Sequence, residues 1–237
     1  GLKDKKLASI TVAAKGSEVK LECAKKDVGC PFDGSGDWIL TAPTQDNADS
    51  SAVGSLASTL LNLTHSEVVD FSGSTPDPKE FGLDQPKGAV TLGILGEKEP
   101  IQLTFGKSSN VGPNVYLALS SEPHRLYLVP NYLPDMVSKE LFHWRNKRLF
   151  PSVDAAAVTE LSWTQNKAGR IRAVRSEDSW KLELPIKAAG SKIMIEGLVS
   201  TLAYSAAKSI YSAPLAKEGG SNPSLGKPEL EVDFKDA

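Results

Sequence analysis

The amino-acid sequence predicts an α+β fold in which tandem repeated units of antiparallel hairpins and meanders each pack against one or two helices. Short runs of alternating apolar and polar residues, separated by Gly and Pro, indicate antiparallel strands. Only a few segments carry apolar residues at helical spacing. Several motifs return 142 residues later, from residue 38 to 180 and from 56 to 198. The shared positions, which we expect to anchor the core of each repeat, are Trp38, Pro43, Leu56 and Leu60, matched by Trp180, Pro185, Leu198 and Leu202.

The repetition divides the chain into a complete first unit, residues 1–151, and a second, incomplete repeat unit, residues 152–237. The shared register continues beyond the helices, because Val90 is matched by Val232 at the same offset. We therefore expect the last residues to begin a strand whose continuation lies outside this sequence. An incomplete second unit would either leave a sheet edge uncovered or pack with the first unit as one domain.

Each unit opens with two alternating strands and a glycine between them. The runs lie at residues 10–12 and 19–23 around Gly16 in the first unit, and at 161–163 and 171–174 around Gly169 in the second. A glycine between two such runs is typical of a β-hairpin. A third strand carries the tryptophan motif, and its terminal proline places that strand at an edge or before a turn.

One amphipathic helix follows the third strand in each unit. Apolar residues recur at intervals of three and four across residues 53–61 and again across 195–202. That spacing places them on one helix face. Polar residues suited to a helix start, Asp49 and Ser191, come just before the two segments.

The rest of the first unit is predicted to be an antiparallel meander followed by a helix. Glycines and prolines separate alternating runs at residues 90–94, 101–105, 115–119 and 126–128, which suits strands that pair with their neighbours in sequence. Pro134 favours the first turn of a helix. We expect that helix to continue through Phe142.

The two cysteines, Cys23 and Cys30, lie in a Gly- and Pro-rich segment that has no counterpart in the second unit. The repeat offset is 151 residues before this segment and 142 after it, so about nine residues are inserted there. A disulfide that closes the insertion is one interpretation, and it would imply an oxidising compartment. Two unrelated thiols, one in a strand and one in a loop, are the other. The spacing does not match a CxxC metal or redox motif.

Charge and hydropathy argue against several classes of partner. The 27 basic and 29 acidic residues are interleaved and give a formal net charge of -2, so the chain has no overall attraction for nucleic acid. No run approaches the roughly 18 apolar residues that cross a membrane. The chain is therefore either a soluble protein or part of an anchored protein without its anchor, and we favour the second. No phosphate-binding glycine motif occurs, and no cofactor is predicted.

Candidate catalytic and metal-binding residues do not form a recognisable pattern. His65, His124 and His143 are scattered and lack the spacing of zinc ligands. No G-x-S-x-G motif precedes a helix, so a nucleophilic serine is not indicated. Residues 33–37 set two aspartates around glycines like a calcium loop, but they lack the regular ligand spacing and the distant glutamate. We interpret this segment as a turn.

The densest basic cluster consists of Arg145, Lys147 and Arg148, beside Trp144. Arginine forks can bind an acidic protein, a phosphate or a carboxylate in two-point contacts. Arginines at a helix end can instead hydrogen-bond the last carbonyls and complement the helix dipole, which is the interpretation we favour. If one aromatic side chain is exposed for binding, Trp144 is the candidate.

Four motifs in order carry a family resemblance. They are W-x-L-x-x-P at residues 38–43, F-G-L-D-x-P at 81–86, V-Y-L at 115–117 and F-x-x-R-x-K-x-L-F at 142–150. Together they resemble the bacterial domain-of-unknown-function 4340 family, over nearly the whole chain. Members of that family typically carry an N-terminal membrane anchor, and some are encoded beside or fused to the auxiliary subunit of a gliding-motility-type ABC transport system. The resemblance implies a periplasmic or extracytoplasmic, membrane-anchored envelope protein, with no catalytic residues to carry over, and the cysteine insertion departs from the family's pattern.

The function we expect is a non-enzymatic scaffold or binding subunit beside membrane transport or motility proteins. The residues shared by the two copies are mainly Trp, Leu, Pro and Gly, which preserve a fold but do not make the asymmetric set of groups that catalysis needs. The alternative is a small-molecule or glycan binding module with the ligand between the units, lined by Trp144, Tyr116 or Tyr127. A hydrolase is the third hypothesis, although no nucleophile and base can be named for it.

Overall fold

The computed structural model describes residues 4–33, 35–165, 169–210 and 230–236. The chain divides into two compact units, Gly1–Asn146 and Lys147–Ala237. The sequence places the boundary at residue 151, but residues 147–149 already bond within the second unit. The Ala207 amide donates to the Lys147 carbonyl at 2.7 Å, and the Leu149 amide donates to the Ser205 carbonyl at 2.9 Å.

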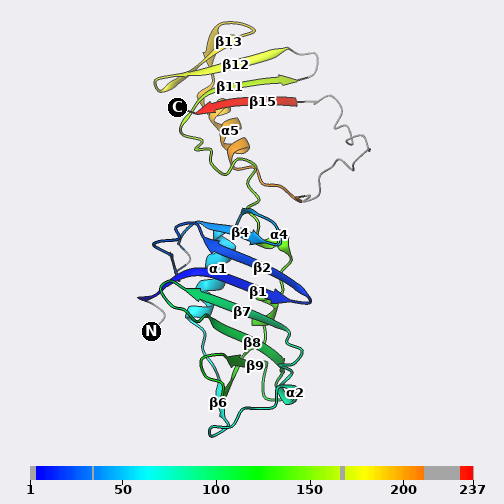
Figure 1. The fold of residues 1–237 in the computed structure, drawn as a ribbon. Helices are drawn as coiled ribbons and strands as arrows, with labels where there is room; N and C mark the ends of the chain where they lie inside the picture. Colours follow the sequence, from blue (N-terminus) through cyan, green and yellow to red (C-terminus); the bar gives the residue numbers. More distant parts are fainter. Residues whose placement is uncertain (1–3, 34, 166–168, 211–229, 237) are drawn as a thin grey trace, which may run out of the picture. The chain divides into compact units, whose positions relative to one another are not determined.

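The first unit is built on a ten-stranded sheet (Figure 1). Every strand pairing within it is antiparallel, and the strand order is β5-β4-β2-β1-β7-β8-β9-β10-β6, with β3 paired to β1. The predicted meander is present as the neighbouring strands β7 to β10. The strands are β1 (Lys6–Ala14), β2 (Ser17–Cys23), β3 (Cys30–Pro31), β4 (Trp38–Ala42), β5 (Asp46–Asn47), β6 (Glu67–Asp70), β7 (Gly88–Ile94), β8 (Ile101–Ser108), β9 (Asn114–Leu119) and β10 (Arg125–Pro130).

The first hairpin turns where the glycine predicted it. Ala14 pairs with Ser17 across a two-residue loop, and both loop residues, Lys15 and Gly16, have positive φ angles of 52° and 76°. Such a loop matches the twist of the strands that it joins, and glycine adopts a positive φ at little cost. The loop therefore sets the register of β1 against β2.

Helix α1 (Ser50–Leu61) supplies the main helical cover of the first core. Its N-cap Asp49 accepts hydrogen bonds from the amides of Ser51 and Ala52, each at 3.1 Å, which satisfies two amides that the first turn leaves unpaired. Most of the apolar stripe expected from the sequence is buried against the sheet. Val53, Leu56, Ala57 and Leu60 are buried, together with Gly54, whereas Leu61 is half-buried.

The predicted helix from Pro134 to Phe142 is wrong in its length. The structure has two short helices instead, α3 (Leu133–Val137) and α4 (Leu141–Trp144). Glu140 interrupts them with extended backbone angles, φ -66° and ψ 159°. The break lets Val137 and Trp144 both enter the core, where they are 2% and 1% exposed. A further short helix, α2 (Pro78–Phe81), precedes β7.

In the residues that the structure describes, the second unit has a five-stranded antiparallel sheet in the order β14-β13-β12-β11-β15 and one long helix. Strand β15 lies at one edge of the sheet, beside β11 (Figure 1). Together the two units confirm a mixed, strand-rich α+β class. The elements are β11 (Val158–Gln165), β12 (Arg170–Ser176), β13 (Ser179–Leu184), β14 (Ala188–Gly190), α5 (Lys192–Ala203) and β15 (Leu230–Asp236).

The tryptophans and leucines of the recurring sequence motifs lie in or against the cores, whereas the prolines of these motifs do not. Trp38, Leu56 and Leu60 are buried in the first unit and Trp180 in the second, while Leu198 and Leu202 are half-buried against the second core. Pro43 and Pro185 are exposed, so the expectation that they anchor the core is wrong. Each follows a cis peptide bond at the end of its tryptophan strand, where the chain turns back to pair with that strand.

Cys23 and Cys30 form a disulfide in the first core. The bond joins the end of β2 to β3 and both residues are almost fully buried. Gly36 packs against it so closely that an added Cβ would lie 2.8 Å from the Cys30 sulfur. The segment between the two cysteines is therefore tied to the sheet at its base.

We expect the double variant Cys23→Ala/Cys30→Ala to lower the free energy of unfolding by about 2 to 3 kcal/mol, because the closed loop no longer restricts the unfolded chain. Urea unfolding of the oxidised protein, with and without dithiothreitol, measures the effect. The reductant should destabilise the wild type and leave the double variant unchanged. An equal response of both proteins would contradict the expectation.

Gly106→Ala should destabilise the first unit by about 2 kcal/mol, since an added Cβ on β8 would overlap the carbonyl oxygen of Phe81 at the end of α2. Gly197→Ala is the control, because nothing lies within 4 Å of its Cβ position on α5 and alanine favours a helix by about 0.5 to 1 kcal/mol. Thermal unfolding should rank the Gly106 variant below wild type and the Gly197 variant above it. The reverse order would show that the backbone of α2 moves away from the added Cβ at little energetic cost.

Candidate functional site

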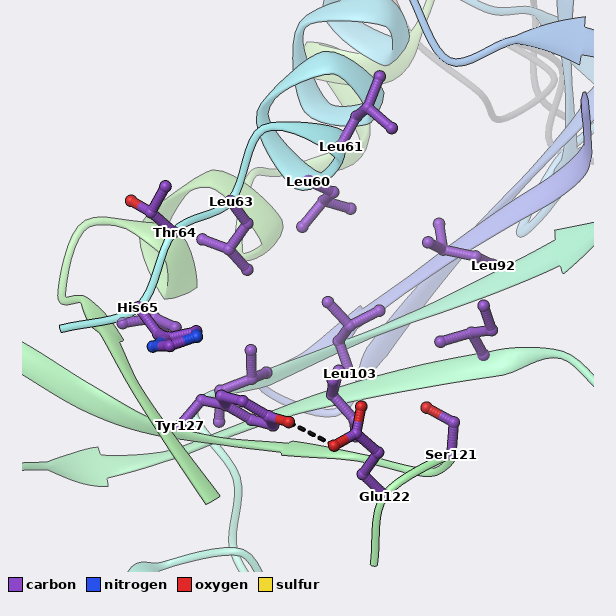
Figure 2. A pocket seen from close by; sticks show the side chains of 14 residues that line it. Leu60, Leu61, Leu63, Thr64, His65, Leu92, Leu103, Ser121, Glu122 and Tyr127 are labelled. Carbon is purple, nitrogen blue, oxygen red and sulfur yellow. Dashed lines mark hydrogen bonds between the residues drawn. The ribbon is translucent and has the colours of Figure 1, made fainter. Parts of the chain in front are cut away.

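The most developed candidate site is an apolar pocket inside the first unit, with a volume of about 400 Å³. It lies between the last turn of α1 and the inner face of strands β7 to β10 (Figure 2). Nine of its fourteen lining residues are leucine, isoleucine or valine. The lining residues are Leu60, Leu61, Leu63, Thr64, His65, Leu92, Ile101, Leu103, Leu117, Leu119, Ser121, Glu122, Tyr127 and Val129.

Local sequence explains how the strands present this lining. Successive side chains of a strand point to opposite faces of the sheet, so Leu117 and Leu119 on β9 share one face, as do Tyr127 and Val129 on β10. The helix ends at Leu61. The pocket lies at this end of the helix, where Leu60, Leu61 and Leu63 line it opposite the strands.

One wall of the pocket carries a polar group of three side chains. The Tyr127 hydroxyl donates to Glu122 Oε2 at 2.5 Å, and the imidazole of His65 lies with its ring centre 5.3 Å from that of Tyr127 (Figure 2). The hydrogen bond from Tyr127 lowers the pKa of Glu122. Burial, and then the bond to the carboxylate, raises the pKa of Tyr127. Glu122 is thus held as a carboxylate beside a neutral phenol.

A polar hollow of about 330 Å³ adjoins the apolar pocket and shares Ser121 and Glu122 with it. Arg125 donates from Nε to Asp70 Oδ2 at 3.0 Å and from Nη1 to Glu122 Oε2 at 3.3 Å. The pKa of Asp70 is lowered by the amide of Ser72 and then by Arg125. The hollow therefore contains two ionised carboxylates and one guanidinium.

The predicted role of Trp144 as an exposed aromatic is wrong. Its side chain is 1% exposed within the first core, and its Nε1 donates to the Lys139 carbonyl at 3.4 Å. Burial is favoured because the indole is the largest apolar surface on α4. Tyr116 also does not line the apolar pocket, and it packs edge-on against Phe81 instead.

The basic cluster makes intramolecular contacts within each unit. Arg145 is only 11% exposed and pairs with Asp46, with Nη2 and Oδ2 2.6 Å apart. In the second unit, Arg148 Nη2 donates to the Ala203 carbonyl at the end of α5, at 3.4 Å. Its guanidinium also lies over the ring of Tyr204. The contact with Ala203 is of the kind that arginine makes with the last carbonyls of a helix.

The chain matches a family model described as domain of unknown function (DUF4340) over residues 38–222. It belongs to the DUF4340 family. No curated protein and no solved structure matched the chain.

The described residues of this DUF4340 chain contain no group of three or more histidine, cysteine or carboxylate side chains able to hold a metal ion. Asp33 accepts bonds from the amide and hydroxyl of Ser35, at 2.8 and 2.6 Å, as in a turn closed by an aspartate. The helices that the structure describes are all too short or too polar to span a bilayer.

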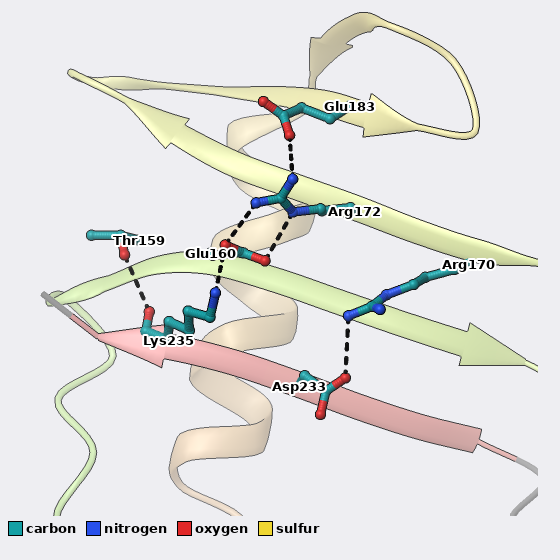
Figure 3. A network of polar contacts seen from close by, with 7 residues as sticks. All are labelled: Thr159, Glu160, Arg170, Arg172, Glu183, Asp233 and Lys235. Carbon is teal, nitrogen blue, oxygen red and sulfur yellow. Dashed lines mark hydrogen bonds and ion pairs between the residues drawn. The ribbon is translucent and has the colours of Figure 1, made fainter.

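A charged network crosses the sheet of the second unit (Figure 3). Arg172 makes a two-point contact with Glu160, at 2.9 and 3.0 Å, and a single contact with Glu183 at 2.8 Å. Lys235 on β15 approaches the same Glu160 at 3.4 Å. The hydrogen bonds from Arg172 lower the pKa of Glu160 to about 2. The network therefore links four neighbouring strands.

Glu160→Gln should lower the free energy of unfolding at pH 7 by about 1 kcal/mol, because a partly exposed two-point ion pair is lost. The folded pKa of about 2 lies below the ordinary value of 4.5, so the stabilisation is present above pH 4.5 and is lost as the pH falls toward 2. In urea titrations, the difference in the free energy of unfolding between wild type and Glu160→Gln should be smaller at pH 2.5 than at pH 7. Glu183→Gln, which loses one contact to the same arginine, is the control and should lower the free energy of unfolding by less. If the effect of Glu160→Gln were independent of pH, the ion pair with Arg172 would not be its cause.

Proposed function

We propose that this chain is a non-enzymatic extracytoplasmic scaffold or binding subunit of an envelope transport or motility system, built from two copies of one structural repeat. The observation that carries the proposal is the matching plan of the two units. Sheet order β5-β4-β2-β1-β7 in the first unit has the same plan as β14-β13-β12-β11-β15 in the second. In each unit, a twelve-residue helix follows the strand that is named first in this order, β5 or β14.

The strand registers support the same proposal residue by residue. Val12 pairs with Val90 in the first unit, and the residues expected at these positions in the second unit, Trp163 and Val232, pair with each other. The register shifts correspond as well, since one falls between Leu7 and Ser9 and the other between Val158 and Glu160. Matching pairings and irregularities are what a duplicated unit would retain.

The charged side chains of both units also suit a framework protein. Arg145 and Asp46 pair within the first unit, and Glu160, Arg172 and Glu183 join strands of the second. These contacts hold neighbouring elements together. The envelope location and the transport partner rest on the family resemblance, which implies a membrane anchor and a neighbouring transport system.

Binding of a small molecule is the second candidate function, and the apolar pocket of the first unit favours it. Its volume lies within the range of about 300 to 1,000 Å³ typical of small-molecule sites. Aliphatic lining suits an apolar ligand better than a glycan, whose hydroxyl groups would lose hydrogen bonds to water there.

Large exposed side chains on α5 are the contact to test for the scaffold role. Ile193 and Met194 are 84% and 73% exposed, whereas the matching residues of the first unit are the smaller Ser51 and Ala52. Exposed apolar groups of this kind mark interaction surfaces when they gather in one place. Their replacement should weaken partner binding without opening the core.

Affinity capture of the membrane-anchored, full-length protein from its native envelope, followed by mass spectrometry, tests the proposed function. Wild type should recover membrane transport subunits, and Ile193→Lys/Met194→Lys should recover at least tenfold less of them. Val28→Lys/Val111→Lys is the matched control, because these two exposed side chains belong to the first unit. Capture of no transport or motility subunit by wild type would reject the scaffold role, and equal capture by all three proteins would reject the contact on α5.

A further inference from the structure

We propose that the apolar pocket and the adjoining polar hollow of the first unit form one binding site for a soluble single-chain amphiphile, with its alkyl tail in the pocket and a hydrogen-bond-donating, cationic head in the hollow. The inference names a ligand class for the second candidate function and rests on it. Its basis is the juxtaposition of the two cavities, which share Ser121 and Glu122.

The size of the pocket limits the tail to one chain. A volume of about 400 Å³, at about 30 Å³ for each water-sized group, holds about a dozen non-hydrogen atoms. One alkyl chain of ten to twelve carbons fits that number, and two chains do not. Affinity should therefore rise with chain length and stop rising when the pocket is full.

The chemistry of the pocket suits a saturated tail. Leu60, Leu103 and Leu117 come from three different elements and all line the pocket. None of these side chains offers a hydrogen bond, so burial of methylene groups is the main source of affinity. Each added methylene should tighten binding by about fourfold while it still enters the pocket.

The polar end favours a head that donates hydrogen bonds. Tyr127 and Arg125 both donate to Oε2 of Glu122, and the described residues donate no hydrogen bond to its Oε1, which is left to accept one from a ligand. Asp70 and Glu122 carry two negative charges against the single positive charge of Arg125. An ammonium head would complement the net negative charge, and a carboxylate head would be repelled.

The histidines beside the site are compatible with such a head. His65 lies next to Tyr127 at the edge of the apolar pocket, and the Nδ1 of His124 contacts the Ser74 carbonyl in the hollow at 3.0 Å. A neutral imidazole can accept a hydrogen bond from an ammonium or hydroxyl group. In the hollow itself, a neutral His124 would add one such acceptor for the head.

Isothermal titration calorimetry of the full chain with n-alkylammonium ions of six to sixteen carbons, below their micelle concentrations, tests the proposal. We expect one ion per chain, about fourfold tighter binding for each methylene, and a plateau near ten to twelve carbons. Fatty acids of equal length should bind at least tenfold more weakly. Heat without saturation, or affinity that is independent of chain length, would overturn the proposal.

Three variants separate the tail site from the head site. Leu103→Trp should abolish binding of every amphiphile by filling the pocket, and Leu117→Phe serves the same purpose if that variant does not fold. Glu122→Gln should retain the length dependence and bring the preference for ammonium over carboxylate within about threefold. Glu99→Gln, an exposed glutamate that lines neither cavity, is the control and should match wild type.

The outcomes distinguish this inference from the scaffold role. Unchanged binding by a folded Leu103→Trp or Leu117→Phe variant would show that the tail does not bind in the pocket. An unchanged preference for the ammonium head in Glu122→Gln would show that the head does not bind in the hollow. Either result overturns the proposal. Neither result affects capture of transport subunits, which tests the scaffold role separately.

Discussion

The burial of α1 against the inner face of the first sheet is the interaction on which the rest of that unit depends. Twelve residues make a helix of about 18 Å, whereas nine consecutive strands at about 4.8 Å spacing extend about 38 Å. One helix is too short to cover that face. The chain returns after β10 so that Val137 and Trp144 complete part of the cover, and the part left open beyond Leu61 is the apolar pocket (Figure 2).

Charged groups serve different purposes in the two units. Around Glu160 they join neighbouring strands on one surface of the second sheet (Figure 3), and Arg148 holds the end of α5. Around Glu122, Tyr127 and Arg125 donate to the same carboxylate oxygen. This similar set of contacts borders a cavity instead. The difference in surroundings, more than the residue types, makes the Glu122 group a candidate site and the Glu160 group a framework.

The features that the sequence predicts correctly are those with a local signal. The hairpin at Gly16 and the helix after Asp49 follow from turn chemistry, capping and periodicity, all of which act over a few residues. The short strand β6 was not predicted, because its partner β10 begins 55 residues further along the chain, where Asp70 pairs with Arg125. The burial of Trp144 was missed for a similar reason, since the break at Glu140 that turns it inward serves contacts with distant parts of the core.

The sequence by itself determined the α+β class, the family, the order of the main elements and the shared tryptophan and leucine positions, because alternation, helical spacing and recurring motifs are properties of the chain alone. It also placed Cys23 and Cys30 at the ends of an inserted segment. Only the tertiary structure decided that these cysteines are bonded, that Arg145 pairs with Asp46 across 99 positions, and that Leu60, Leu117, Glu122 and Tyr127 surround one cavity. Those decisions depend on which strands become neighbours and where a helix stops covering them, and the packing of the whole unit sets both.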